Sequence, residues 1–219
     1  MDQALVSAAR MRLYTGVVSD VLDSLDSWTH AMLPHIRPLD ENLTMFGRAR
    51  TGLYGPVYHV EPNKNPYELE IALIDSLEVD DVAVLACPPG NRVAPWGELL
   101  STAAQARKAA GCVTDGLVRD VRLIREIKFP VFAGGIGPLD SKGRGVVTNI
   151  DVPIECGNVP IRPGDWILGD VDGVVVIPDA IAEKVITLSL EKVDRETTVR
   201  QELAAGEKLS VVFARHQIL

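Results

Sequence analysis

The sequences VAVLAC at residues 82–87, CVTDGLVRD at residues 112–120 and PVFA at residues 130–133 decide the fold class. Each contains a short apolar run of the kind that forms a buried strand. Residues 97–110, GELLSTAAQARKAA, lie between the first two runs, and their apolar side chains recur at helical spacing. A shorter helix is expected over residues 121–124, before the third run. Strands that alternate with helices in this way are typical of parallel crossover units in an α/β protein.

Further helices and strands are predicted on the N-terminal side of this region. Residues 3–25 have helical character, and Thr15 or Ser19 is a candidate cap for a second helix within them. Residues 47–54 are predicted to form a strand that is interrupted by glycines. Residues 66–75 have the apolar spacing of a helix.

The pattern changes to β-structure on the C-terminal side. Residues 145–178 contain short apolar runs separated by turn residues, and residues 179–205 then predict a long charged helix. Gly111 is expected to end the alanine-rich helix in the left-handed conformation that glycine tolerates. We see neither a linker nor a repeat, so residues 1–219 are predicted to form a single domain.

The composition is that of a globular chain with an acidic balance. Of the 219 residues, 47% are hydrophobic, which is enough for a core that needs no disulfide bonds. The net charge of −8 disfavours a surface that coats nucleic acid. The chain shows neither a secretory signal nor an apolar run of ~20 residues, so we expect no membrane span.

The cysteines and histidines favour no metal cluster or disulfide framework. The three cysteines, Cys87, Cys112 and Cys156, are odd in number and far apart, which is typical of buried thiols in a reducing cytoplasm. The four histidines are scattered and show no HExxH pattern. A histidine-bound zinc site is therefore not expected.

The first candidate site is the helix start at Gly97, Glu98, Leu99 and Leu100. A glycine at this position lets a ligand approach the backbone, and the free N–H groups of the first helical turn attract anions. The alternative is an ordinary helix start without a ligand, since many helices begin with a small residue.

The second candidate site is the pair Arg119-Asp120, which directly follows an apolar strand. The carboxyl ends of parallel strands are where α/β proteins place their sites. Arg119 can grip a carboxylate through two N–H groups, and Asp120 can hold magnesium or manganese, which need only one or two carboxylates beside water. The alternative is a surface salt bridge. The glycine-rich loop at residues 134–137 matches no nucleotide-binding pattern and is interpreted as a close-approach loop near the pocket.

Taken together, these segments resemble one family. It contains the class II pyruvate aldolases for 4-hydroxy-4-methyl-2-oxoglutarate and 4-carboxy-4-hydroxy-2-oxoadipate, and the RraA-like proteins, named after the regulator of ribonuclease E activity A. The matching segments run in order from about residue 15 to residue 180. They are residues 18–23, 47–51, 97–100, 111, 115–116, 119–120, 130–133, 162–165 and 172–178.

The resemblance implies an αββα layered sandwich like the swivelling β/β/α domain, assembled as a homotrimer or homohexamer with sites between subunits. It implies that Gly97, Glu98, Leu99 and Leu100 bind the carboxylate of a 2-keto acid substrate, and that Arg119 contacts its carboxylate and carbonyl. Asp120 would bind the divalent metal, magnesium or manganese. The metal would polarise the 2-keto oxygen during retro-aldol cleavage to pyruvate, and oxaloacetate decarboxylation would be a side activity.

One position departs from the family pattern. The aldolase signature places an acidic residue three positions after the metal aspartate, but this chain has Leu123 there. Glu126 follows one turn later and is not expected to reach the metal. The residue that handles the proton is left open between Glu98 and Glu196, the latter donated by the C-terminal helix of a neighbouring subunit.

Two other functions remain open at this point. The chain could be a dedicated decarboxylase of a 2-keto acid. It could also be a non-catalytic RraA-like regulator that binds a ribonuclease. The presence of Asp120 favours an enzyme, because the regulator branch often lacks that residue. The C-terminal helix carries Ile181, Val185, Leu188 and Val193 on one face, which suits a contact between subunits. The alternative is that this face packs on its own sheet.

Overall fold

The computed structural model describes residues 1–88, 90 and 92–218 of the protein. The helices are α1 (Gln3–Arg12), α2 (Thr15–Ser24), α3 (Glu68–Asp75), α4 (Glu98–Ala106), α5 (Val121–Ile127), α6 (Ala182–Ala204) and α7 (Leu209–His216), with a 3₁₀ turn (Asp179–Ile181) before α6. The strands are β1 (Arg37–Pro38), β2 (Met45–Pro56), β3 (Asp81–Ala86), β4 (Gly111–Val118), β5 (Val131–Ile136), β6 (Gly145–Ile150), β7 (Ile154–Cys156), β8 (Val159–Ile161), β9 (Trp166–Asp170) and β10 (Gly173–Ile177). No helix within the described residues is both long and apolar enough to cross a membrane.

The middle of the chain forms the predicted parallel crossover units. Strand β2 pairs in parallel with β3, β3 with β4, and β4 with β5. All six residues of β3 are buried, as expected of a strand covered on both faces. The carboxyl ends of β3, β4 and β5 therefore lie at one edge of the sheet, beside the start of α4 and the start of α5.

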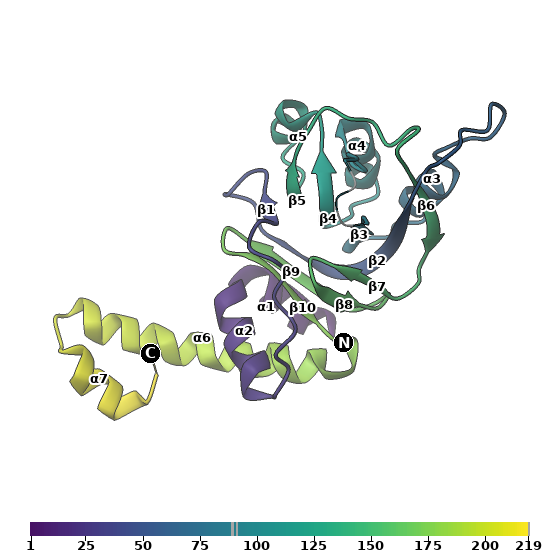
Figure 1. Cartoon of the computed structure of the whole chain (residues 1–219). Helices are drawn as coiled ribbons and strands as arrows, with labels where there is room; N and C mark the ends of the chain where they lie inside the picture. The colour runs from purple at the N-terminus through teal and green to yellow at the C-terminus, as the bar shows by residue number, and fades with distance from the viewer. Residues whose placement is uncertain (89, 91, 219) are drawn as a thin grey trace.

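The sheet curls until its two ends nearly meet. Its strand order is β1-β5-β4-β3-β2-β9-β10, with β6 also paired to β2. Residues 30–32 run beside β10, where Met32 N donates to Val174 O (3.0 Å) and Val176 N to His30 O (2.9 Å). The same stretch continues into β1, which pairs with β5. One short segment thus connects the two ends of the sheet and leaves it nearly closed (Figure 1).

Helices cover the sheet on two opposite sides, which gives the predicted αββα layers. Helices α4 and α5 lie over the parallel strands and α3 lies beside β2 and β6, whereas α1, α2 and α6 lie against β9 and β10 (Figure 1). Side chains alternate between the two faces of β3. Ala83 and Leu85 pack under the helices on one face, while Val82 and Val84 face the interior between the β layers. The fold class predicted from the sequence is confirmed.

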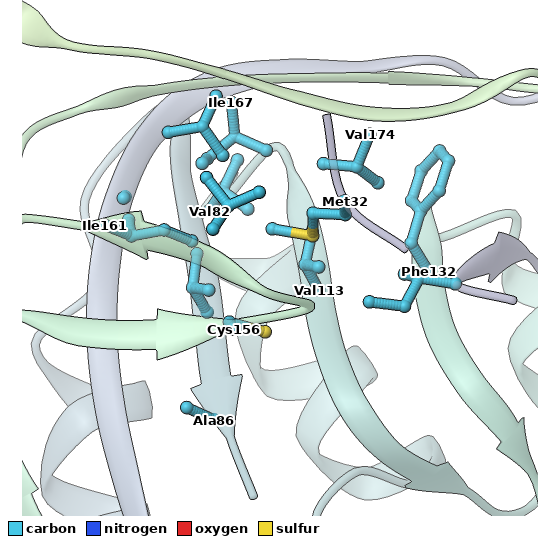
Figure 2. Close-up of a cluster of buried hydrophobic side chains, with 14 of the residues drawn as sticks. Met32, Val82, Ala86, Val113, Phe132, Cys156, Ile161, Ile167 and Val174 are labelled. Atoms are coloured by element: carbon cyan, nitrogen blue, oxygen red, sulfur yellow. The ribbon is translucent and has the colours of Figure 1, made fainter. Parts of the chain in front are cut away.

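The interior between the two β layers is apolar. Figure 2 shows Val82 and Val113 from the parallel strands facing Ile167 and Val174 from β9 and β10. The β7–β8 hairpin closes one side of this core with Ile154, Cys156 and Ile161, all of which are buried. Cys112 is also buried, as the sequence predicted, whereas Cys87 is only half-buried; all three cysteines are free.

Several local predictions were wrong. Helix α4 ends at Ala106 instead of extending to residue 110, and Lys108 (φ +61°) adopts the left-handed conformation that was assigned to Gly111. Gly111 instead begins β4, where an added Cβ would lie 2.4 Å from Met45 Sδ and 2.8 Å from Pro130 O, so its role is close packing. The second helix has Tyr14 as its N-cap, not Thr15 or Ser19.

The C-terminal region contains one helix more than predicted. The long helix α6 ends at Ala204, close to the predicted end, but α7 then folds back on it through Val199, Leu203, Val212 and Ile218. The far half of α6 and α7 project from the layered body as an arm (Figure 1). Leu209, Val211 and Phe213 of α7 remain exposed.

Candidate active site

Arg119 and Asp120 lie where β4 ends and α5 begins. Asp120 is the N-cap of α5 and has a left-handed backbone (φ +60°), which aspartate tolerates better than most residues. Its carboxylate makes no capping hydrogen bond to its own helix. The side chain is about two-fifths exposed and is therefore available to a ligand.

A buried tryptophan fixes the start of α4 beside this pair. Arg119 N donates to Trp96 O (3.0 Å), and Trp96 and Val118 form a parallel bridge. The Trp96 indole is fully buried and donates to Ser101 Oγ (2.7 Å), which in turn donates to Gly97 O (3.1 Å). The first turn of α4 is thereby held against the end of β4.

The two candidate segments meet at Gly97. A Cβ at this position would lie 2.8 Å from Asp120 Oδ2 and 3.3 Å from Arg119 Nε, and Glu98 N points at the same Asp120 oxygen (3.4 Å). The backbone of Gly97 is extended (φ −151°), so glycine is required here for space and not for its conformational freedom. Gly97, Arg119 and Asp120 therefore converge, although they belong to two separate segments of the sequence.

The remaining predicted residues of α4 lie at the same helix start. The Glu98 carboxylate accepts from Thr102 Oγ1 (2.7 Å), one turn along α4. The Leu99 side chain is 76% exposed, whereas Leu100 is half-buried and packs toward the core under α4. Gly97, the N-cap, has no side chain, and Asp120 Oδ2 approaches the Glu98 amide of this turn, so the amides of Leu99 and Leu100 are the ones that can accept an anionic ligand.

The Arg119 guanidinium lies between two carboxylates. Its Nε is 3.6 Å from Asp120 Oδ2, and its Nη1 is 3.5 Å from Asp140 Oδ1. The other oxygen of Asp140 accepts a hydrogen bond from Tyr67 Oη (2.7 Å). Asp140 and Tyr67 were not predicted as site residues. Asp140 follows the glycine-rich loop that the sequence placed near the pocket, but Tyr67 is too distant in sequence to carry any signal.

The electrostatics of this group favour a charged Asp140 beside a protonated tyrosine. Partial burial works against ionisation of Asp140, but the Tyr67 hydrogen bond and the charge of Arg119 hold the pKa of this carboxyl below its usual range. Burial and the hydrogen bond to Asp140 raise the pKa of Tyr67 to about 12. Deeper in the same region, burial raises the pKa of Glu70, which accepts from Tyr54 Oη (2.6 Å).

An open hollow lies in front of Arg119 and Asp120. Its other lining residues are Val121, Ile136, Gly137 and Pro138, so one wall is charged and the other is mostly apolar. Among the described residues no group of three or more His, Cys, Asp or Glu side chains is placed to hold a metal ion. A single exposed carboxylate with room for water still fits magnesium, which keeps several of its waters when it binds to proteins.

The other acidic candidates are engaged elsewhere in the chain. Leu123 occupies the position of the family's acidic residue, and Glu126 pairs with Arg122 on α5 (2.6 Å). Glu196 accepts a hydrogen bond from Tyr14 Oη within its own chain and is largely buried. Burial and that hydrogen bond raise the pKa of Tyr14 to about 12.

Comparisons with known proteins show which family the chain belongs to. The family model described as "RraA-like: Aldolase/RraA" matches residues 15–176. The chain belongs to the RraA-like family. Its relatives include a protein of Halalkalibacterium halodurans named "Putative 4-hydroxy-4-methyl-2-oxoglutarate aldolase". The two are 37% identical over 178 residues, which cover 81% of this chain and 79% of that protein.

Solved structures of RraA-like proteins share the fold. An uncharacterised protein from Pseudomonas syringae superposes with a TM-score of 0.86 at 25% identity, covering 98% of this chain and 95% of that one. Streptomyces coelicolor RraAS2, described as an unusual member of the RNase ES inhibitor RraA protein family, superposes with a TM-score of 0.80 at 24% identity. It covers 91% of this chain and 97% of its own, and at this identity the likeness concerns the fold alone.

Proposed function

We propose that this RraA-like protein is a divalent-metal-dependent pyruvate aldolase that cleaves a 4-hydroxy-2-keto acid. The observation that carries the proposal is the convergence of Gly97, Arg119 and Asp120, with Asp120 Oδ2 only 3.4 Å from the amide of Glu98. A helix start whose N-cap is a glycine and an adjacent arginine suit the carboxylate of a 2-keto acid. An exposed aspartate beside them suits a cation.

Asp120 is the residue that would hold the cation, magnesium or manganese. Its carboxylate faces the open hollow, and the missing Cβ of Gly97 leaves the space next to its Oδ2 free. When bound, the cation supplies a Lewis acid that polarises the 2-keto oxygen and stabilises the negative charge that develops on it.

The residues of the chain then bind and orient the substrate. Arg119 contacts the substrate carboxylate and the neighbouring carbonyl oxygen, and the first-turn amides of Leu99 and Leu100 hold the same carboxylate from α4. Ile136 is 65% exposed at the edge of the hollow and offers an apolar surface to the part of the substrate beyond C4.

The cleavage needs one proton removed and one proton added. The C4 hydroxyl loses a proton, the C3–C4 bond breaks, C4 becomes a carbonyl, and C3 of the pyruvate enolate takes up a proton. Glu98 is our candidate for the first transfer, since it lies on the first turn of α4 next to Asp120. Oxaloacetate decarboxylation yields the same enolate with loss of carbon dioxide, so we propose it as a side activity.

We further propose that the active form is a homotrimer or a homohexamer in the cytoplasm. The α6 face that the sequence offered for a subunit contact packs against α1, α2 and the sheet of its own chain. The exposed apolar side chains of the projecting α7, Leu209, Val211 and Phe213, support a subunit contact instead. Three free cysteines fit a reducing compartment.

The experiment that tests this function is a panel of 2-keto acids with enzymatic detection of pyruvate, run with magnesium and with manganese. The expected result is metal-dependent pyruvate release from 4-hydroxy-4-methyl-2-oxoglutarate or a related 4-hydroxy acid, with slower release from oxaloacetate. Release from oxaloacetate alone would favour a dedicated decarboxylase. Inactivity on every member, together with binding to a ribonuclease, would favour the regulator function of the RraA-like family.

A further inference from the structure

We propose that Asp140 and Tyr67 are positioning residues that fix which edge of the Arg119 guanidinium meets the substrate carboxylate. This inference rests on the proposed function, because it assigns partners to the same arginine. Neither residue touches the substrate in this arrangement, and both act through Arg119.

The contacts divide the guanidinium into two sides. Nη1 faces Asp140 Oδ1 at 3.5 Å, whereas Nε lies on the side of Asp120 at 3.6 Å. A carboxylate is gripped most strongly by two parallel N–H groups of one guanidinium edge. With Nη1 paired to Asp140, the edge formed by Nε and Nη2 is the one left for the substrate carboxylate, and its Nε lies on the side of Asp120, which lines the hollow together with Arg119.

Asp140 is itself held in place by several elements. Its Oδ2 accepts from Tyr67 Oη (2.7 Å), and Tyr67 directly precedes α3. Its loop is tied to β4 by the bond from Gly137 N to Val118 O (3.0 Å) and to the segment before α4 by the bond from Ala94 N to Leu139 O (3.2 Å). The next residue, Ser141, is buried.

This rigidity has a consequence for binding. Arginine has many side-chain conformations, and ordering it when the substrate binds costs free energy. A fixed carboxylate on its Nη1 side removes part of that cost in advance. The ionised state of Asp140 and the protonated state of Tyr67 are both favoured at neutral pH, since their pKa values shift away from 7 in opposite directions.

A simpler interpretation makes the opposite prediction. Asp140 is a negative charge near an anion site, so electrostatic repulsion alone predicts that its removal strengthens the binding of a carboxylate. Positioning predicts that its removal weakens binding and slows turnover. The sign of the change therefore distinguishes the two interpretations.

The test compares Asp140→Asn and Tyr67→Phe with the wild-type enzyme, with Asp75→Asn as the matched control. Asp75 pairs with Arg107 (2.6 Å) outside the hollow, so its change removes a carboxylate from an arginine of similar exposure. The measurements are kcat and KM for pyruvate release and the calorimetric Kd of oxalate in the presence of magnesium. We expect Asp140→Asn to lose about tenfold in kcat/KM and to bind oxalate more weakly, Tyr67→Phe to show a smaller loss, and Asp75→Asn to match the wild type.

A second measurement separates positioning from a general structural role. In an Arg119→Lys background, Asp140→Asn should add less than about twofold, because its effect passes through the arginine. A full tenfold loss in that background, or tighter oxalate binding by Asp140→Asn, would overturn the inference.

Wild-type kinetics and wild-type oxalate binding in Asp140→Asn would overturn it while leaving the aldolase function intact. Absent pyruvate release from the wild type, with oxalate binding that still weakens in Asp140→Asn, would instead refute the aldolase and support the positioning. Absent oxalate binding by the wild type would refute the positioning.

Discussion

Replacing Gly97 with alanine places one methyl group at the point where the two candidate segments meet. The new Cβ would lie 2.8 Å from Asp120 Oδ2 and 3.3 Å from Cγ and Nε of Arg119. Ordinary van der Waals contact begins at 3.4 Å, so the carboxylate oxygen must retreat by about 0.6 Å (3.4 − 2.8). The backbone conformation of Gly97 is open to alanine, so the perturbation is confined to these neighbours.

The expected consequence is a loss of activity with little loss of stability. A misplacement of ~1 Å in a catalytic group can cost ~10²-fold, so we expect a decrease of 10- to 100-fold in kcat, about 1.4–2.7 kcal/mol of activation free energy. Alanine in place of glycine at a helix N-cap costs only about 0.5–1 kcal/mol of folding free energy.

The assay is steady-state pyruvate release with saturating magnesium, alongside urea unfolding of the same preparation. Gly16→Ala is the matched control, because a Cβ there would meet only the Tyr14 ring at 3.8 Å, an ordinary contact. The control should retain wild-type activity. A folded Gly97→Ala variant with wild-type kcat would refute the assignment of the reaction to the junction of Gly97, Arg119 and Asp120.

Three further predictions concern the same molecule. Arg119→Lys should raise KM and lower kcat, because lysine lacks the planar guanidinium that binds a carboxylate through two N–H groups. Asp120→Ala should lower metal-dependent turnover by about 10²-fold or more. Equal steady-state kinetics in both variants and the wild type would exclude this site. Burial raises the pKa of Glu70 above its usual 4.5, so the folded state binds more protons than the unfolded state and the free energy of unfolding falls as pH rises above 4.5. Glu70→Gln, which keeps an acceptor for Tyr54, should therefore gain stability over the wild type in urea unfolding at pH 8 and little at pH 4; an equal effect at both pH values would contradict this. Light scattering should show a trimer or hexamer. On dilution the specific activity should fall together with the mass, and an active monomer of 23.7 kDa would contradict a site shared between subunits.

The fold was largely predictable because its strands carry strong local signals. The apolar run of β3 and the glycine-bounded helix–strand alternation around α4 and β4 specify parallel crossover units before any tertiary contact is known. The nearly closed sheet was not predicted, because residues 30–38 have an irregular, proline-containing sequence and pair with β10 and β5 through backbone groups. Helix α7 was missed because it is short and its apolar contacts with α6 form only in the tertiary fold.

The candidate site residues that the sequence singled out are those whose signals are local. Arg119 and Asp120 directly follow a strand, and Gly97 precedes a helix, so each signal is local. Asp140 and Tyr67 come from two other segments and meet Arg119 only through the tertiary fold. Gly111 was assigned to the wrong role because a packing requirement against Met45 leaves no trace in helical periodicity.

The most direct test of cation-assisted cleavage at Asp120 is pyruvate release from 4-hydroxy-4-methyl-2-oxoglutarate before chelation, after chelation, and after magnesium is restored. We expect chelation to lower kcat by ~10²-fold or more, magnesium to restore it in the wild type, and Asp120→Ala to stay inactive throughout. Undiminished turnover after complete chelation, with borohydride trapping a lysine–substrate adduct, would contradict a metal-dependent aldolase and indicate Schiff-base chemistry instead.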